Sequence, residues 1–120
     1  MKIAITTAGT NLTDAVELRF GRAKSFAIYD TDTKELTFID NSQQLNAAQG
    51  AGIQAAQHVV ASGATALISG HCGPKAMRVL QAKNIAVYVT KEATIQEALD
   101  ALEAGTLEQI TQADVEEHWV

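Results

Sequence analysis

The chain has 120 residues, of which 47% are hydrophobic and 19% are charged, and its formal net charge at pH 7 is -5. This length and balance are typical of one compact domain with its own apolar core, so we expect residues 1–120 to form a single domain. The one cysteine, Cys72, excludes an internal disulfide framework and any metal cage built from several cysteines of this chain. The negative charge argues against a nucleic-acid-binding surface in general.

The sequence also bears on membrane association. No stretch approaches the roughly 18 consecutive apolar residues of a transmembrane helix. The apolar run after Met1 is shorter than that of a secretory signal peptide. We therefore expect a cytoplasmic protein with no membrane partner.

The first third of the sequence predicts three strands. A β-branched, apolar run predicts a strand over Lys2–Thr6, and the long polar segment 7–24 follows it as a loop of functional length. Alternation of apolar and polar residues predicts strands over Ser25–Asp30 and Glu35–Asp40. A tight polar turn joins these two strands into a β-hairpin.

The rest of the sequence alternates helices and strands. The predicted helices and strands are, in order, Gly50–Ser62 (helix), Thr65–Ser69 (strand), Pro74–Lys83 (helix), Ile85–Thr90 (strand) and Thr94–Glu103 (helix). Gly63 and Gly105 suit helix termination, and Thr94 with Glu97 forms a capping pair. The last fifteen residues are acidic and weakly patterned, and we expect them to be mostly coil.

This order of elements, βββαβαβα, specifies a sheet. The first three strands form an antiparallel meander, whereas right-handed helical crossovers make the last two strands parallel to the first. We predict an α/β fold with a mixed five-stranded sheet in the order 3-2-1-4-5, strand 2 antiparallel, and helices on both faces. The loops after strands 1, 3 and 4 then share one edge of the sheet, where ligands of open α/β sheets bind.

That edge collects glycines, arginines and helix starts. Two predicted helices begin there after glycine, so unpaired backbone N–H groups and the positive ends of two helix dipoles face the same space. Arg19 and Arg22 add permanent charge, and Lys75 lies in a first helical turn, where a cation is unfavourable unless it has another role. We interpret this edge as an anion-binding site. Its candidate residues are Thr7, Ala8, Gly9, Arg19, Phe20, Gly21, Arg22, Gly50, Gly52, Gly70, His71, Cys72, Gly73, Pro74 and Lys75.

Some of these side chains allow more than one interpretation. Phe20 lies between the two arginines and is predicted to anchor their loop in the core. Cys72 either fills space in the core or, beside a helix N-terminus, is a reactive thiol, and both interpretations stay open. Cys72 and His71 are the candidates for direct contact with a metal. His58 and His118 are expected to be solvated.

Three segments resemble the dinitrogenase iron-molybdenum cofactor biosynthesis family. They are residues 16–23 (Val-Glu-Leu-Arg-Phe-Gly-Arg-Ala), the helix start Gly50-Ala51-Gly52, and residues 69–76 (Ser-Gly-His-Cys-Gly-Pro-Lys-Ala). The resemblance covers nearly the entire chain, and its most specific part is the arginine-phenylalanine-glycine-arginine segment. This chain has Glu17-Leu18 where many relatives have aspartate-proline.

This resemblance implies an RNase H-like three-layer fold and a non-catalytic carrier. The implied cargo is a preassembled anionic cluster, held without covalent bonds by arginine, lysine and backbone N–H groups. Within the family the chain is most similar to a small carrier of a molybdenum-copper sulfide cluster in sulfate-reducing bacteria; a precursor of the iron-molybdenum cofactor is the related alternative. A carrier also implies a protein donor or acceptor for the cluster.

The same residues bear on three other functions. His71-Cys72 followed by Arg78 has the spacing of a cysteine-dependent phosphatase loop, but Pro74 supplies no N–H donor and already begins a helix. A two-metal nuclease needs clustered carboxylates, and the predicted first and fourth strands contain none. A protein-interaction module without a cofactor remains the third alternative.

Overall fold

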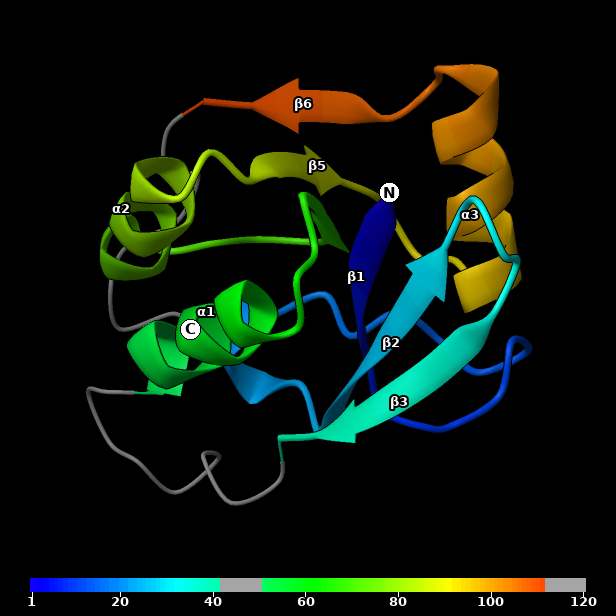
Figure 1. Ribbon diagram of the computed structural model, residues 1–120, viewed down its shortest axis with the longest axis horizontal. Helices are drawn as coiled ribbons and strands as arrows, with labels where there is room; N and C mark the ends of the chain where they lie inside the picture. Colours follow the sequence, from blue (N-terminus) through cyan, green and yellow to red (C-terminus); the bar gives the residue numbers. More distant parts are fainter. Residues whose placement is uncertain (42–50, 112–120) are drawn as a thin grey trace.

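The structure is a computed structural model, and it describes residues 1–41 and 51–111 of the chain (Figure 1). Its elements are, in chain order, β1 (Lys2–Thr7), the short 3-10 helix η1 (Phe20–Arg22), β2 (Ser25–Asp30), β3 (Leu36–Asp40), α1 (Ala51–Ala61), β4 (Ala66–Ser69), α2 (Pro74–Ala82), β5 (Ala86–Val89), α3 (Ile95–Ala104) and β6 (Glu108–Ile110). Every predicted strand and helix is present, and each boundary lies within about one residue of its predicted position, a smaller error than boundary predictions usually carry.

The six strands form one mixed sheet in the order β3-β2-β1-β4-β5-β6. β2 is antiparallel to both β1 and β3, whereas β4 is parallel to both β1 and β5. The predicted order 3-2-1-4-5 is therefore confirmed, together with the antiparallel direction of strand 2.

The sixth strand corrects the prediction of coil near the C-terminus. β6 pairs antiparallel with β5, with Val87 opposite Ile110. Only Ile110 of its three residues is partly buried, so β6 has no alternating pattern that a sequence could reveal. It forms because β5 would otherwise present an unpaired row of backbone groups at the sheet edge. Residues 112–120, also predicted as coil, lie outside the described residues.

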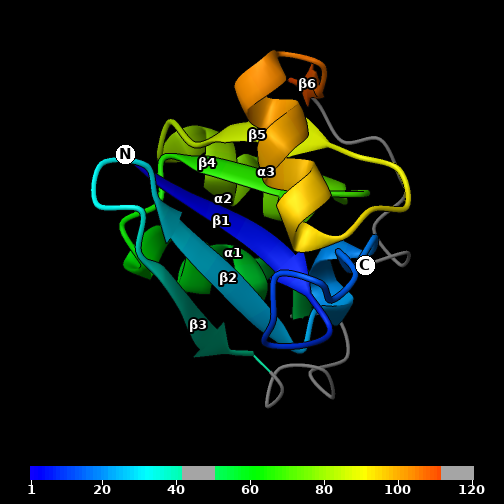
Figure 2. The same ribbon diagram turned by 90° about the vertical axis from the view of Figure 1, so that its right-hand side faces the viewer.

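Helices cover both faces of the sheet, which gives three layers (Figure 2). α1 and α2 pack on one face in a core cluster that includes Ala4, Phe26 and Leu67. α3 packs on the other face, with Ile3 and Ile5 of β1 in its cluster. Ala4 packs on one face of the sheet and its neighbours Ile3 and Ile5 on the other, because successive side chains of a strand point to opposite faces. The predicted three-layer fold is confirmed.

The helix ends follow the predicted capping residues. Thr94 accepts the backbone N–H of Glu97 at 3.1 Å, and the Glu97 carboxylate accepts the N–H of Thr94 at 2.8 Å, which completes a capping box. Gly105 ends α3 with a left-handed φ of 74°, a conformation that costs other residues energy. Among the described residues no helix is long and apolar enough to cross a membrane.

Candidate functional site

The arginine segment and the glycine turn after β4 are hydrogen-bonded to each other. The N–H of His71 donates to the carbonyl of Leu18 at 2.7 Å, and the N–H of Phe20 donates to the carbonyl of His71 at 3.1 Å. Arg19 and His71 therefore form a parallel β-bridge. Two segments about fifty residues apart in the sequence, both predicted to lie at this edge, are brought into direct contact.

Gly70 allows this contact because the two backbones approach closely. A Cβ atom at Gly70 would lie 2.3 Å from the carbonyl oxygen of Leu18 and 2.6 Å from its Cα, distances that real Cβ atoms essentially never show. Any other residue would push the two segments apart. The sequence indicated a turn glycine here, and the structure gives it a packing role as well.

The arginines are carried on a short turn that is anchored in the core. Phe20 is fully buried, and its ring centroid lies 5.9 Å from that of Phe26. The N–H of Arg22 donates to the carbonyl of Arg19 at 3.0 Å, which closes the η1 turn, while both arginine residues remain exposed. Gly21, between them, is buried. The predicted anchoring role of Phe20 is confirmed.

A buried hydroxyl pair holds the segment that leads into Arg19. The Thr6 hydroxyl donates to the carbonyl of Glu17 at 2.6 Å and lies 3.0 Å from the hydroxyl of Ser69. Thr6 has a single hydroxyl proton, so Ser69 is the donor in the second bond. The Glu17 carboxylate in turn accepts the N–H of Arg19 at 3.2 Å. Neither Thr6 nor Ser69 was predicted as a site residue, although each is a polar residue at the end of a buried strand, and that pattern was the available signal.

The start of α2 lies next to this turn. Its N-cap residue is Gly73, which makes no side-chain capping bond, and its first residue, Pro74, has no N–H. Lys75 follows in the first turn and is partly buried. The positive end of this helix dipole therefore lies at the same edge of the sheet as the arginine turn.

The start of α3, at the same edge, is already fully capped. Beyond the capping box of Thr94, the N–H of Ile95 donates to Asp14 and the N–H of Gln96 donates to Leu12, each at 3.0 Å to a carbonyl oxygen. The first backbone N–H groups of α3 are therefore already hydrogen-bonded within the protein and are not available to a ligand. The start of α2 differs in that its N-cap, Gly73, makes no side-chain capping bond.

The turn formed by Thr7, Ala8 and Gly9 directs its polar groups inward. The N–H of Gly9 donates to the Thr7 hydroxyl at 3.0 Å, and the Ser25 hydroxyl donates to the Gly9 carbonyl at 3.1 Å. A Cβ atom at Gly9 would lie 2.0 Å from a carboxylate oxygen of Asp14. These contacts give Thr7 and Gly9 a role in stabilising the turn. The role of this turn in ligand binding stays a prediction.

Cys72 lies in the core and not at the surface. It is fully buried in the cluster that also holds Phe20, whereas His71 is half-buried. This placement favours the interpretation of Cys72 as a space-filling residue. The structure also disfavours a phosphatase loop. Pro74 begins α2, and Arg78 lies inside this helix and is exposed. In residues 1–41 and 51–111, His, Cys, Asp and Glu side chains form no group of three or more that could hold a metal ion.

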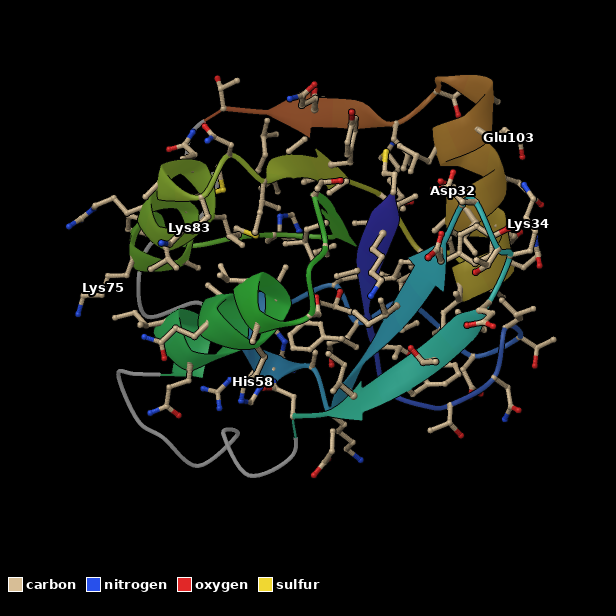
Figure 3. All side chains as sticks on the ribbon, viewed as in Figure 1. Asp32, Lys34, His58, Lys75, Lys83 and Glu103 are labelled. Atoms are coloured by element: carbon tan, nitrogen blue, oxygen red, sulfur yellow. The ribbon has the colours of Figure 1, made fainter. Side chains whose placement is uncertain are left out.

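His58 corrects an expectation, because it is held by a hydrogen bond. Its Nδ1 lies 2.6 Å from the Oδ1 atom of Asn41, whose amide nitrogen donates to the carbonyl of Ala23 at 2.8 Å. That second bond fixes the orientation of the amide, so His58 donates from Nδ1. Figure 3 shows His58 on the side of α1 that faces the end of β3. The prediction of a solvated residue is wrong here because Asn41 reaches His58 only through the tertiary fold.

Of the remaining predicted residues, one lies at the start of α1 and the others lie outside the described part of the chain. Gly52 is buried in the first turn of α1. Gly50, the loop before it and His118 lie outside the described residues.

Two hollows lie on the described surface. One, of about 560 Å³, adjoins the candidate site and is lined by Ala8, Arg19, Glu17 and Glu92 among others. The other, of about 380 Å³, lies between α3 and the β2–β3 hairpin, with apolar walls that include Leu36 and Leu99. The second hollow contains none of the predicted site residues.

The sequence matches one protein family, and the fold is similar to solved structures. Residues 1–105 match the family model described as dinitrogenase iron-molybdenum cofactor. The structure is similar to the apo form of the orange protein from Desulfovibrio gigas, with 36% sequence identity over 95% of this chain and 96% of that chain and a TM-score of 0.91. It is also similar to a Thermotoga protein of the DUF35 family named as a candidate NifB protein, with 35% identity, coverage of 96% and 97%, and a TM-score of 0.85.

A more distant structure shares the fold alone. A candidate dinitrogenase from Methanocaldococcus jannaschii has 19% identity, coverage of 93% of this chain and 96% of its own, and a TM-score of 0.69. No curated protein matches this sequence.

Proposed function

Since the chain belongs to the dinitrogenase iron-molybdenum cofactor family, we propose that it is a non-catalytic carrier of a preassembled anionic metal-sulfide cluster that contains molybdenum. The resemblance noted from the sequence implies a molybdenum-copper sulfide cluster first and an iron-molybdenum cofactor precursor second. We propose that the carrier acts in the cytoplasm and exchanges the cluster with a protein donor or acceptor.

The cluster would bind at the edge formed by Arg19, Arg22 and residues 70–75. The observation that carries this proposal is the β-bridge between Arg19 and His71, which holds the arginine turn against the loop that starts α2. This contact supports the proposal because it brings the turn that carries Arg19 and Arg22 to the same edge of the sheet as the start of α2, where Lys75 and the positive end of the helix dipole lie.

These groups suit a cluster that arrives and leaves intact. Arginine is charged at every relevant pH and offers several donors in a fixed plane, so it can contact sulfide groups without forming a metal bond. Because Arg19 and Arg22 are exposed, salt will screen their attraction for the cargo. Cys72 is fully buried, so the proposal does not use its thiolate as a ligand.

The proposal is tested by loading the full chain with tetrathiomolybdate and a copper salt, followed by gel filtration. The readouts are the visible spectrum and the molybdenum and copper that stay with the protein. The test variant is Arg19→Gln with Arg22→Gln, and the matched control is Lys2→Gln with Lys34→Gln, which removes the same charge elsewhere on the surface.

We expect the arginine variant to retain the cluster at least about tenfold more weakly, with the difference growing as salt is raised, because charge-assisted hydrogen bonds are lost. The lysine control and Cys72→Ser should change retention far less. Equal retention in the arginine variant would place the site elsewhere. Absence of colour and of bound metal in the unaltered protein would refute the carrier function.

A further inference from the structure

The hollow between α3 and the β2–β3 hairpin is a candidate binding site separate from the cluster edge. Its volume of about 380 Å³ lies within the range of pockets that bind small molecules, and none of the predicted site residues lines it. In the described part of the chain, α1 and α2 pack on one face of the sheet, but only α3 packs on the other (Figure 2). The hollow exists because a single helix does not cover the hairpin on that face.

The surface of this hollow is mainly apolar. Ile3 of β1, Leu36 of β3 and Leu99 of α3 line it, and the two leucines are only half-buried. Among the described residues, the large apolar side chains that are exposed are Met1, at 54%, and Leu12, at 37%, and both line the same hollow. An apolar patch of this kind with polar groups around it is typical of a binding site.

The two walls of the hollow carry complementary polar groups. The hairpin wall includes Lys34 and Tyr29, whose ammonium and hydroxyl groups can donate hydrogen bonds. The α3 wall includes Asp100 and Glu103, whose carboxylates accept them, and Asp100 already accepts from the amide of Gln96 at 2.9 Å. Figure 3 shows Lys34 at the hairpin turn and Glu103 on α3, on the same side of the molecule.

The charges of the two walls do not neutralise each other. Within residues 1–41 and 51–111, no ion pair joins Lys34 to a carboxylate of α3, and the amino group of Met1 pairs instead with Asp32, at 3.0 Å. A cation on one wall and a carboxylate on the other suit a ligand with an apolar body and oppositely charged ends, because each end can meet its counter-charge.

We propose that this hollow binds a short apolar peptide with free ends. The ammonium end of the peptide faces Glu103, and its carboxylate faces Lys34. Its apolar side chains fill the space between Leu36 and Leu99. The proposal goes beyond cluster carriage and does not depend on it, since the predicted cluster-binding residues lie outside the hollow.

A ligand with a single charge fits only one wall. An apolar carboxylate would pair with Lys34 but would bring a negative group towards the carboxylates of α3, and an apolar amine would meet the converse problem at Lys34. A peptide with both charges avoids these repulsions. The volume of the hollow limits the ligand to a few residues.

The test is isothermal titration calorimetry of the full chain with the dipeptide Leu-Leu at low ionic strength. Two modified peptides remove one charge each, because N-acetylation removes the ammonium and C-terminal amidation removes the carboxylate. The test variants are Glu103→Gln and Lys34→Gln, and the matched controls are Glu108→Gln and Lys83→Gln. Both control residues are exposed and lie outside the hollow.

We expect each charge of the peptide to act on its own wall. N-acetylation should weaken binding about fivefold in the unaltered protein, as the loss of an exposed ion pair does, but less than about twofold in Glu103→Gln. Amidation should show the same relation to Lys34→Gln, and neither control should change these ratios. Gly-Gly, which has the same ends and no apolar side chain, should bind at least about tenfold more weakly than Leu-Leu.

Four results would overturn the proposal. The absence of saturable Leu-Leu binding at millimolar concentration would mean that the hollow is not a peptide site. An equal effect of N-acetylation in the unaltered protein and in Glu103→Gln would mean that the ammonium does not face Glu103. Equal affinity of a Leu-Leu peptide blocked at both ends would identify an internal segment of a partner protein as the occupant. A concentration-dependent rise in molecular mass, lost in Leu12→Asp, would identify a second copy of the chain.

Discussion

Substitution of Gly70 by alanine tests the contact on which the candidate site depends. The new Cβ would lie 2.3 Å from the carbonyl oxygen of Leu18, whereas an ordinary van der Waals contact is 3.4–4 Å. Both atoms nearest to it belong to the Leu18 backbone, so no flexible side chain can move aside. The segment that carries Arg19 must therefore shift away from the glycine turn.

The cost follows from the contacts that this shift disturbs. Overpacking of this kind costs about 1–3 kcal/mol. The two hydrogen bonds between the segments, at His71 and Phe20, contribute about 1 kcal/mol each. We expect the free energy of unfolding to fall by about 3–5 kcal/mol, which for a chain of this size lowers the melting temperature by about 12–20 °C.

The matched control is Gly105→Ala, at the end of α3. A Cβ there meets nothing within 4 Å, but φ is 74°, so the cost is that of a left-handed conformation, about 1 kcal/mol. Thermal melts should therefore separate the two variants, and cluster retention well below either melting temperature should fall only for Gly70→Ala. If Gly70→Ala were as stable as Gly105→Ala and retained the cluster fully, the argument from close backbone approach would be wrong.

Three further substitutions test the supporting structure. Asn41→Ala removes the amide that joins His58 to the backbone, and we expect chemical denaturation to show a loss of about 1–3 kcal/mol, with the Nδ1–H signal of His58 altered in NMR spectra; an unchanged signal would contradict the assigned bond. Thr94→Ala breaks the capping box of α3 and should cost about 1 kcal/mol in the same assay, whereas Thr94→Ser should cost less. The N–H of Asp32 lowers the pKa of the Asp30 carboxylate, so this carboxylate stabilises the fold above about pH 4 and the contribution is lost as pH falls; Asp30→Asn should lower the melting temperature near neutral pH but much less in acid, and an equal decrease at both would refute the assignment.

The candidate site combines a rigid frame with exposed charges. Thr6, Ser69 and Phe20 are buried and fix the backbone at the edge of the sheet, while Arg19 and Arg22 remain exposed. Such a site can hold an anionic cargo in a defined place without enclosing it. That combination suits a carrier, because a partner protein can reach the cargo from the same side.

Much of this site was visible in the sequence, but its geometry was not. The order of elements already placed Arg19 and the Gly70 turn at one edge of the sheet. It did not show that Gly70 lies against Leu18, nor that Cys72 is turned into the core, because both depend on how two distant segments pack. The hydroxyl bond between Thr6 and Ser69 was missed for the same reason.

The sequence alone determined the elements whose signals are local. The hairpin of β2 and β3, the capping box of Thr94 and the terminator Gly105 each depend on residues a few positions apart, so periodicity and capping rules were sufficient. Tertiary structure alone decided β6 and the bond between His58 and Asn41. Each of these joins segments distant in the chain, and only folding brings their backbone groups and side chains together.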